Sequence, residues 1–470
     1  MNSIKMTALG LFLAFSSYFS LTGWFLANGA GPDFVYSRAA ADFYHAENRM
    51  AVYPDDVDKM VFSRYGNSRL LRPPLGYFYT AQLVKLPILK DLLRSYAYRV
   101  ATALLAGLTV MFIFLALRLY FDNYWYAVFG ATSLGLMPQF GFYASYFSDD
   151  MVAFLTSSIL AYTIVLIYKR GLSLSRQIFF AFAAGLCIVS KQTAWIFIIP
   201  AIVFYFIFML NYSFEYFKSR NFFQPFIFMS IAFIVGGGWW LLFNVYQYGP
   251  NNFQLSDIAV ELMNNHATIP VTNIGYDASN IGIKQLLIVN YHNFIGNSYI
   301  AFVGNLDWLR LKVGSLQYGF YLWVVIGIVL NSFILLYQMI EFGVDRLKRL
   351  TFEQFPRAFV FELILYFAIA LQVYLYTRHN VYTDIQIQGK YLMAVFIPML
   401  ILALSFYSKV LNYLNQRFDQ FELPRSVKIA FIIVLIATPV LIHLDAIVMH
   451  VIPFYWPEVS IYSDFDPARR

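Results

Sequence analysis

The sequence predicts an all-helical integral membrane protein with about 11 transmembrane helices. Of its 470 residues, 60% are hydrophobic and 13% are charged. A soluble protein typically has about 25% charged residues. The mean hydropathy is +0.60. Apolar stretches of about 20 residues recur along the chain, and each is long enough to cross a bilayer. Together, these observations exclude a soluble globular protein.

The predicted spans follow one another with short polar connections, apart from two longer ones. They cover residues 6–27, 100–120, 124–143, 151–168, 177–191, 193–213, 226–246, 319–340, 358–376, 391–408 and 428–449. The fifth and sixth spans could also form one long kinked helix. The apolar stretch 75–89 is short and is interrupted by Lys85 and Pro87. We therefore expect it to be an interfacial helix rather than a span.

We expect a single membrane domain over residues 1–470, with two large outer segments at 28–99 and 247–318. With the N-terminus in the cytoplasm, Lys and Arg exceed the acids in the inner loops, whereas the outer segments are balanced. The positive-inside rule favours this orientation, in a plasma membrane that is the inner membrane of a bacterium. The net charge of +7 then follows from topology and needs no nucleic-acid partner.

Two further features concern the first span and the single cysteine. The first span, 6–27, could be a signal peptide, but its apolar run is long for an h-region and favours a retained helix. The single cysteine, Cys187, excludes an intramolecular disulfide framework.

Charged residues are predicted at the outer ends of several spans. Asp33 follows the first span, and Asp149 and Asp150 occupy the turn between the third and fourth. Lys191 ends the fifth span, and Lys390 opens the tenth. If the spans form a bundle, these side chains lie on the same side of the membrane. Each also has a purely structural explanation, such as a helix cap for the acids or a headgroup contact for the lysines.

A cation on a rigid turn, Arg72 before Pro73 and Pro74, lies in the first outer segment. One arginine side chain can bind two phosphate oxygens at once, and fixed cations stabilise the charge of a phosphate as it leaves. A carboxylate can take the proton from an attacking hydroxyl. The set therefore favours transfer from a phosphate-activated, lipid-linked donor, although Arg72 could also contact anionic membrane lipids.

In order and placement, these residues resemble motifs of the GT-C superfamily, polytopic glycosyltransferases that use polyprenyl- or dolichyl-phosphate sugars. Asp33 resembles the acidic motif that supplies the catalytic base early in the first outer loop. The run Arg72-Pro73-Pro74-Leu75-Gly76-Tyr77 resembles the Lys- or His-Pro-Pro-Leu-x-Tyr segment of that loop. In aminoarabinose transferases, its basic residue binds the lipid phosphate. The pair Asp149-Asp150 matches an acidic pair in the second outer loop.

The C-terminal half resembles a bacterial GT-C-like group. Gly304-Asn305-Leu306-Asp307 is similar to its Gly-x-Leu-Asp element, and Gln388-Gly389-Lys390-Tyr391 is similar to its Gln-Gly-Arg-Tyr motif. Lysine at 390 keeps the charge but loses the bidentate fork of arginine. Many members have Asp-Glu where this chain has Asp33-Phe34, so we expect Asp33 to act largely alone. The resemblance permits a divalent metal, but no metal ligand or cofactor is assigned.

The resemblance implies a hexosyl- or pentosyltransferase that moves a sugar, with inversion, from a polyprenyl phosphate to a glycan or lipid acceptor of the cell envelope. The expected site residues are Asp33 (general base), Asp149 and Asp150 for catalysis, Arg72, Lys191 and Lys390 for the donor phosphate, and Tyr77, Asp307 and Tyr391 for the substrate. One alternative is a polysaccharide polymerase or ligase, which depends on arginines in large outer loops. Another is a transporter, with Glu362 as its membrane-embedded charge.

Overall fold

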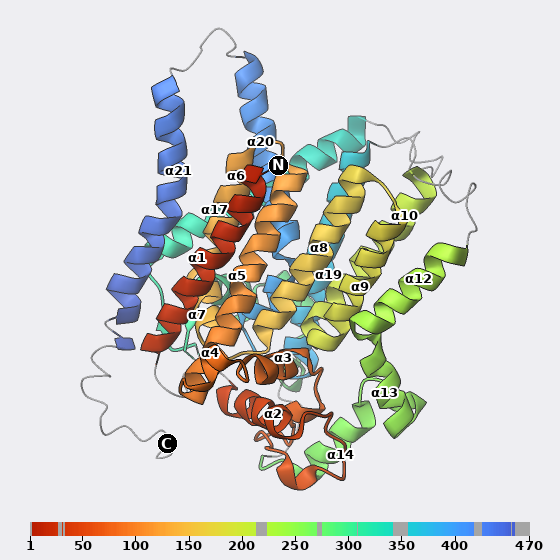
Figure 1. Ribbon diagram of the computed structural model, residues 1–470. Coiled ribbons are helices and arrows are strands. Elements are labelled where there is room, and N and C mark those ends of the chain that lie inside the picture. Colours follow the sequence, from red (N-terminus) through yellow and green to blue (C-terminus); the bar gives the residue numbers. More distant parts are fainter. Residues whose placement is uncertain are drawn as a thin grey trace.

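The computed structural model describes residues 2–26, 31, 33–212, 223–269, 275–307, 309–341, 356–417, 425–452 and 454–455. Long helices form a bundle, and a group of short helices lies against one of its ends (Figure 1). Within these residues, nine helices are long and apolar enough to cross a membrane. The predicted all-helical membrane fold is confirmed.

The nine candidate spans include several that combine consecutive helices. They are α1 (Asn2–Phe25), α5 (Arg94–Tyr120), α8 (Asp150–Arg170), α10 (Gln192–Tyr212), α12 (Phe223–Phe233) with η3 (Ile234–Gly238) and α13 (Trp239–Tyr248), α17 (Ser315–Glu341), α19 (Arg357–Tyr382), η8 (Gly389–Val395) with α20 (Phe396–Arg417), and α21 (Arg425–Ala446) with η9 (Ile447–Val451).

Two of the eleven predicted spans fall short of this length. The helix α9 (Leu174–Ser190) is apolar but has only 17 residues. The stretch 124–143 is divided into α6 (Tyr124–Gly135) and α7 (Pro138–Ser145). Pro138 occupies the first turn of α7, where a missing N–H costs little, and it cannot continue the preceding helix. The predicted number of eleven spans is therefore not confirmed.

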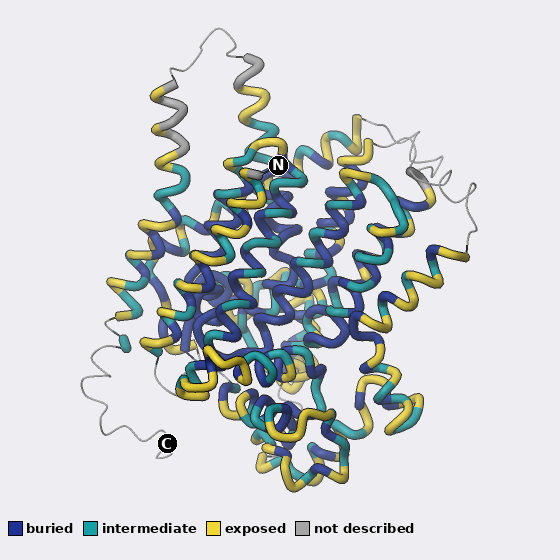
Figure 2. Tube along the Cα trace, in the orientation of Figure 1, coloured by how far each residue is buried: buried dark blue, intermediate teal, exposed yellow. Residues whose placement is uncertain are grey.

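The centre of the bundle is built from α5, α8 and α20. The apolar windows of α5 and α8 are 67% and 78% buried, and that of η8 with α20 is 72% buried. By contrast, only 22% of the α1 window and 17% of the α21 window are buried. Figure 2 shows the same division, with buried residues inside and exposed ones along the peripheral helices. The exposed apolar surface of α1 and α21 suits contact with lipid.

The segments 28–99 and 247–318, which the sequence predicts to be outer and which we continue to call the outer segments, fold into short elements at the end of the bundle where α1 ends and α5 begins (Figure 1). The first contains α2 (Phe34–Glu47), η1 (Val57–Lys59), η2 (Arg69–Leu71), α3 (Leu75–Leu83) and α4 (Pro87–Lys90). The second contains η4 (Pro250–Asn252), α14 (Ser256–His266), η5 (Tyr276–Ser279), α15 (Ile283–Leu287), η6 (Tyr291–Asn293), α16 (Phe294–Gly304) and the antiparallel strands β1 (Asn305–Leu306) and β2 (Leu311–Lys312).

The interfacial helix expected over 75–89 is in fact two helices, α3 and α4. Leu86, which precedes Pro87, is extended with ψ 141°, because a residue before proline is disfavoured in the helical region. A separate hydrophobic cluster includes Tyr44, Tyr77 and Phe147 and lies between the first outer segment and the bundle. This packing fixes the segment beside the turn that carries Asp149.

Candidate functional site

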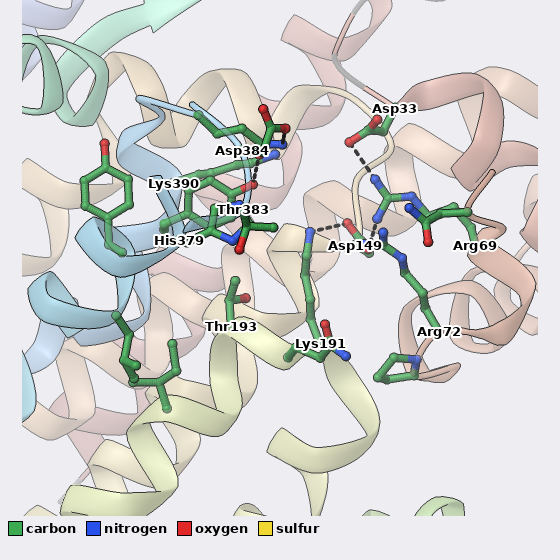
Figure 3. Close-up of a pocket in the computed structure, with 18 of the residues that line it drawn as sticks. Asp33, Arg69, Arg72, Asp149, Lys191, Thr193, His379, Thr383, Asp384 and Lys390 are labelled. Carbon is green, nitrogen blue, oxygen red and sulfur yellow. Dashed lines mark hydrogen bonds and ion pairs between the residues drawn. The ribbon is translucent and has the colours of Figure 1, made fainter. Parts of the chain in front are cut away.

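A cavity of about 580 Å³ lies between the outer segments and the end of the bundle. Its lining comes from the first outer segment, the turn before α8, the junction of α9 with α10, the end of α19 and the start of η8. Figure 3 shows the labelled side chains converging from these separate parts of the sequence. The structure therefore brings together most of the charged residues that the sequence singled out.

Asp33 is the residue that precedes α2, and it lines the cavity. Its backbone is left-handed, with φ 64°, a conformation that aspartate tolerates better than most residues. The side chain makes no cap bond to α2, and it is 36% exposed. Asp33 is much more exposed than Asp149 and Asp150, whose side chains are 7% and 4% exposed.

Arg69 joins Asp33 to the bundle. Its Nη2 lies 2.6 Å from Asp33 Oδ2, and its Nη1 lies 3.2 Å from Asp149 Oδ2. The side chain is only 10% exposed. The prediction missed Arg69, the first residue of η2. Arg72 follows η2 with an extended backbone, so helical spacing gave no signal that linked the two arginines.

Asp149 is buried and surrounded by donors. Lys191 Nζ donates to its Oδ1 at 2.6 Å, and the Tyr77 hydroxyl donates to its Oδ2 at 2.8 Å. Burial alone would raise the pKa of Asp149, but the charges of Lys191 and Arg69 outweigh it and hold that pKa well below its usual range. Asp149 is therefore an anion that positions its neighbours.

Asp150 continues the series of ion pairs. Lys191 Nζ donates to Asp150 Oδ1 at 2.7 Å, and Lys390 Nζ lies 3.4 Å from Asp150 Oδ2. Lys191 is extended, with φ −166°, and it separates α9 from α10. The predicted division into two helices is thus confirmed. We call the resulting series the ion-pair chain; in order, it is Asp33, Arg69, Asp149, Lys191, Asp150 and Lys390.

Arg72 lies beside this chain and lines the same cavity. Among the residues that the structure describes, none forms an ion pair with it. The positive charge of Arg69 and burial both lower the pKa of Arg72. Adding Arg72 to the ion-pair chain gives four cations against three acids, a net charge of +1. An anion bound here would relieve the repulsion between the two arginines.

Gly389 permits the close approach that places Lys390. A Cβ at this position would lie 2.1 Å from Phe302 Cα and 2.2 Å from its backbone nitrogen. Gly389→Ala should therefore destabilise the protein by about 1–3 kcal/mol, because backbone must move to admit the methyl group. Thermal unfolding of the purified protein in detergent measures this effect.

The matched control is Gly319→Ala in α17, where nothing lies within 4 Å of the added Cβ. This substitution should leave the melting temperature unchanged or raise it slightly, since alanine favours the helix. Equal melting temperatures for the two variants would contradict the close packing of η8 on α16.

The remaining predicted site residues are divided between the cavity and its surroundings. Tyr391 lines the cavity, and its hydroxyl donates to Gln386 Oε1. Tyr77 and Asp150 lie outside the lining and support it through Asp149 and Lys191. Asp307 lies outside the lining as well, where it pairs with Arg310 beside the β1–β2 hairpin. The structure does not bring Asp307 to the other predicted residues.

The end of α19 supplies cavity residues that the sequence did not suggest. Gln372, His379 and Asp384 line the cavity together with Thr193 of α10. The prediction missed them because an apolar span dominates α19. Its last turns, however, carry the polar run Thr377 to Asn380, a signal that was present in the sequence.

The acidic groups of the cavity fit side-chain cations better than a metal ion. Among the described residues, no group of three or more His, Cys, Asp or Glu side chains is placed to hold one. Asp33 and Asp149 face the same guanidinium, that of Arg69. A metal ion would have to displace this cation, so we assign it no step.

The residues considered for the two alternative functions lie elsewhere. Glu362 stands near the start of α19, whereas the cavity residues of α19 lie toward its end. Its carboxylate accepts hydrogen bonds from Lys409 at 2.8 Å and from Asn331 at 2.9 Å. In the second outer segment, Lys284, Arg310 and Lys312 do not line the cavity.

Part of the chain matches a known family. Residues 72–240 match the family described as dolichyl-phosphate-mannose-protein mannosyltransferase. This match confirms the resemblance to the polytopic, lipid-dependent glycosyltransferases, and it begins at Arg72.

Comparison with solved structures finds ArnT from Cupriavidus metallidurans bound to undecaprenyl phosphate, with 14% sequence identity and a TM-score of 0.48. The similarity covers 85% of this chain and 59% of that one, so the chain spans about three fifths of the length of ArnT. No curated protein matches the chain.

Proposed function

We propose that the protein is a glycosyltransferase that moves one hexose or pentose from a polyprenyl phosphate to a glycan or lipid acceptor of the cell envelope. The observation that carries this proposal is Arg72, a cavity arginine with no ion-pair partner among the described residues. The neighbouring Arg69 lowers its pKa, and the cluster has a net positive charge. A phosphate diester is the anion whose geometry suits an arginine fork.

The family match and the position of the cavity support a lipid-linked donor. The cavity lies at one end of a bundle of candidate membrane spans, where a polyprenyl chain could remain in the lipid. ArnT, to which the chain is similar, carries undecaprenyl phosphate in its structure. The excess of Lys and Arg in the loops at the other end of the bundle supports an orientation in which the cavity faces the outside of the cell.

Asp33 is proposed as the general base. It takes the proton from the acceptor hydroxyl as the oxygen attacks the anomeric carbon. The new carbon–oxygen bond forms as the bond to phosphate breaks, and the electron pair leaves on the polyprenyl phosphate. Attack opposite the leaving group inverts the configuration at the anomeric carbon. Arg72 and Lys390 stabilise the phosphate, while Asp149 and Asp150 hold Lys191 and the other cations in place.

The ion pair between Arg69 and Asp33 also links donor binding to the proposed base. Arg69 Nη2 lies 2.6 Å from Asp33 Oδ2. A donor phosphate that draws Arg69 toward itself would free this carboxylate oxygen to meet the acceptor hydroxyl.

The direct test of the phosphate site is Arg72→Gln. This variant should bind undecaprenyl phosphate about 10- to 100-fold more weakly, because a charge-assisted hydrogen bond contributes about 1.5–3 kcal/mol. The affinity of Arg72→Lys for undecaprenyl phosphate should lie between those of Arg72→Gln and the wild type, since lysine keeps the charge but loses the bidentate fork. Native mass spectrometry of the detergent-solubilised protein, titrated with undecaprenyl phosphate, measures the affinity.

Arg64→Gln is the matched control, because Arg64 lies in the same outer segment but does not line the cavity. Its affinity should equal that of the wild type. Wild-type affinity in Arg72→Gln would remove the proposed phosphate site.

A further inference from the structure

The cavity has a second side, which differs in chemistry from the ion-pair chain. We define the polar wall as Thr193, Gln372, His379, Asp384 and Tyr391, all of which line the cavity. In Figure 3, His379, Thr383 and Asp384 lie on one side of the view, while Asp33, Arg69 and Arg72 lie on the other. The wall offers amide, imidazole, hydroxyl and carboxylate groups, a mixture that suits an uncharged ligand with several hydroxyls.

Three side chains of the polar wall have unused hydrogen-bonding capacity. Thr193 Oγ1, Gln372 Oε1 and His379 Nε2 are buried atoms with no hydrogen-bond partner in the part of the chain that the structure describes. A buried polar atom without a partner costs about 1–3 kcal/mol, so folded proteins rarely keep several together. Rotation about the side-chain torsions of Thr193 and His379 would let their atoms meet a ligand in the cavity.

The backbone around the polar wall is held in place by side chains. Asn380 Oδ1 accepts from the Gln386 N–H at 2.8 Å, and Asn380 Nδ2 donates to the Tyr376 carbonyl at 2.9 Å. Gln372 Nε2 donates to the carbonyl of Tyr391. The side-chain Nε2 of Gln386 donates to the carboxylate of Asp384. These bonds order the segment that follows α19, and such preorganisation lowers the entropic cost of binding.

We propose that the polar wall binds the hydroxyl groups of a carbohydrate, namely the sugar carried by the donor. This inference rests on the function proposed above. The phosphate and its sugar are joined through one oxygen, so a sugar whose phosphate contacts Arg72 must lie in the same cavity. The cavity of about 580 Å³ is of the size that encloses a small organic ligand, about 300–1,000 Å³.

The test compares undecaprenyl phosphate with a panel of undecaprenyl phosphates that carry glucose, mannose, galactose or arabinose. The full-length wild type should bind at least one sugar-bearing lipid more tightly than undecaprenyl phosphate. Thr193→Val and His379→Phe remove the unpartnered atoms while roughly preserving side-chain volume. Each should weaken binding of that sugar-bearing lipid roughly three- to tenfold, the effect of losing one neutral hydrogen bond. Binding of undecaprenyl phosphate should not change.

Tyr374→Leu is the control on the same helix, because Tyr374 is exposed and does not line the cavity. It should bind every lipid as the wild type does. A wild type that gains nothing from any sugar, or variants that keep the gain, would overturn the assignment to the donor. If the variants instead raise only the KM for the envelope acceptor, the acceptor carbohydrate occupies the wall, and the assignment to the donor is equally overturned.

Failure of the proposed function gives a different result. In that case the wild type would not bind undecaprenyl phosphate, with or without a sugar. If a variant instead loses only the additional affinity that the sugar contributes and still binds undecaprenyl phosphate, the polar wall and the phosphate site contribute to binding separately.

Discussion

Asp33→Asn should reduce sugar transfer by about 10²- to 10⁴-fold, the usual contribution of a positioned general base. The amide keeps the size of the side chain but cannot accept the proton of the acceptor hydroxyl. Undecaprenyl phosphate should still bind, and slightly more tightly, because Arg69 loses a competing anion. Turnover is measured as release of undecaprenyl phosphate from a labelled donor in proteoliposomes with an envelope-glycan acceptor.

Asp58→Asn provides the comparison, since Asp58 is an exposed acid of the same outer segment that lies outside the cavity lining. It should turn over at the wild-type rate. Full activity in Asp33→Asn would remove Asp33 as the base and direct attention to Asp384, another carboxylate that lines the cavity. A loss of lipid binding parallel to the loss of turnover would point to a structural role for Asp33.

Asp149→Ala should cost about 3–5 kcal/mol of stability, the usual effect of removing one partner from a buried ion pair. The substitution leaves Arg69 and Lys191 with less negative charge around them, and the Tyr77 hydroxyl loses its acceptor. The free energy of unfolding is followed through thermal unfolding in detergent. Asp122→Ala, which removes an exposed acid from the opposite end of the bundle, should have little effect.

The contribution of Asp149 should also depend on pH in a defined direction. Its pKa is lowered in the folded protein, so its stabilising effect is present above the ordinary carboxyl pKa of about 4 and is lost as the pH falls further. The difference in melting temperature between wild type and Asp149→Asn should therefore be constant from neutral pH to about pH 4. A difference that disappears near neutral pH would mean that Asp149 is not held as an anion.

The fold was largely predictable because apolar length and low charge are strong local signals. The predicted break near Lys191 corresponds to the observed end of α9, whereas α5 begins at Arg94, six residues before the predicted span. Two predictions depended on local geometry that hydropathy does not report. Pro138 divides the third span, and Pro87 divides the expected interfacial helix. In both cases the proline was visible, but its effect on an apolar run was underestimated.

Residues of the cavity were predictable where they stand next to recognisable motifs or at the end of a span, as Lys191 does. Arg72, the Asp149–Asp150 pair and Lys390 were found in this way, and each lies in or beside the cavity. Arg69 was missed because its role depends on a contact with residues 36 and 80 positions away, Asp33 and Asp149. Apart from Tyr391, the members of the polar wall were missed because hydrogen bonds after α19, not sequence spacing, bring them together.

The shared guanidinium of Arg69 limits how the protein can be recombined with its relatives. A chimera that exchanges the first outer segment alone would pair a foreign loop with this chain's Asp149. Unless the foreign loop carried a cation at the position of Arg69, Asp149 and the acid at position 33 would have no cation to share. The smallest exchangeable unit is therefore discontinuous: it comprises the loop together with the turn before α8. A chimera must therefore take the loop and the turn from the same parent protein.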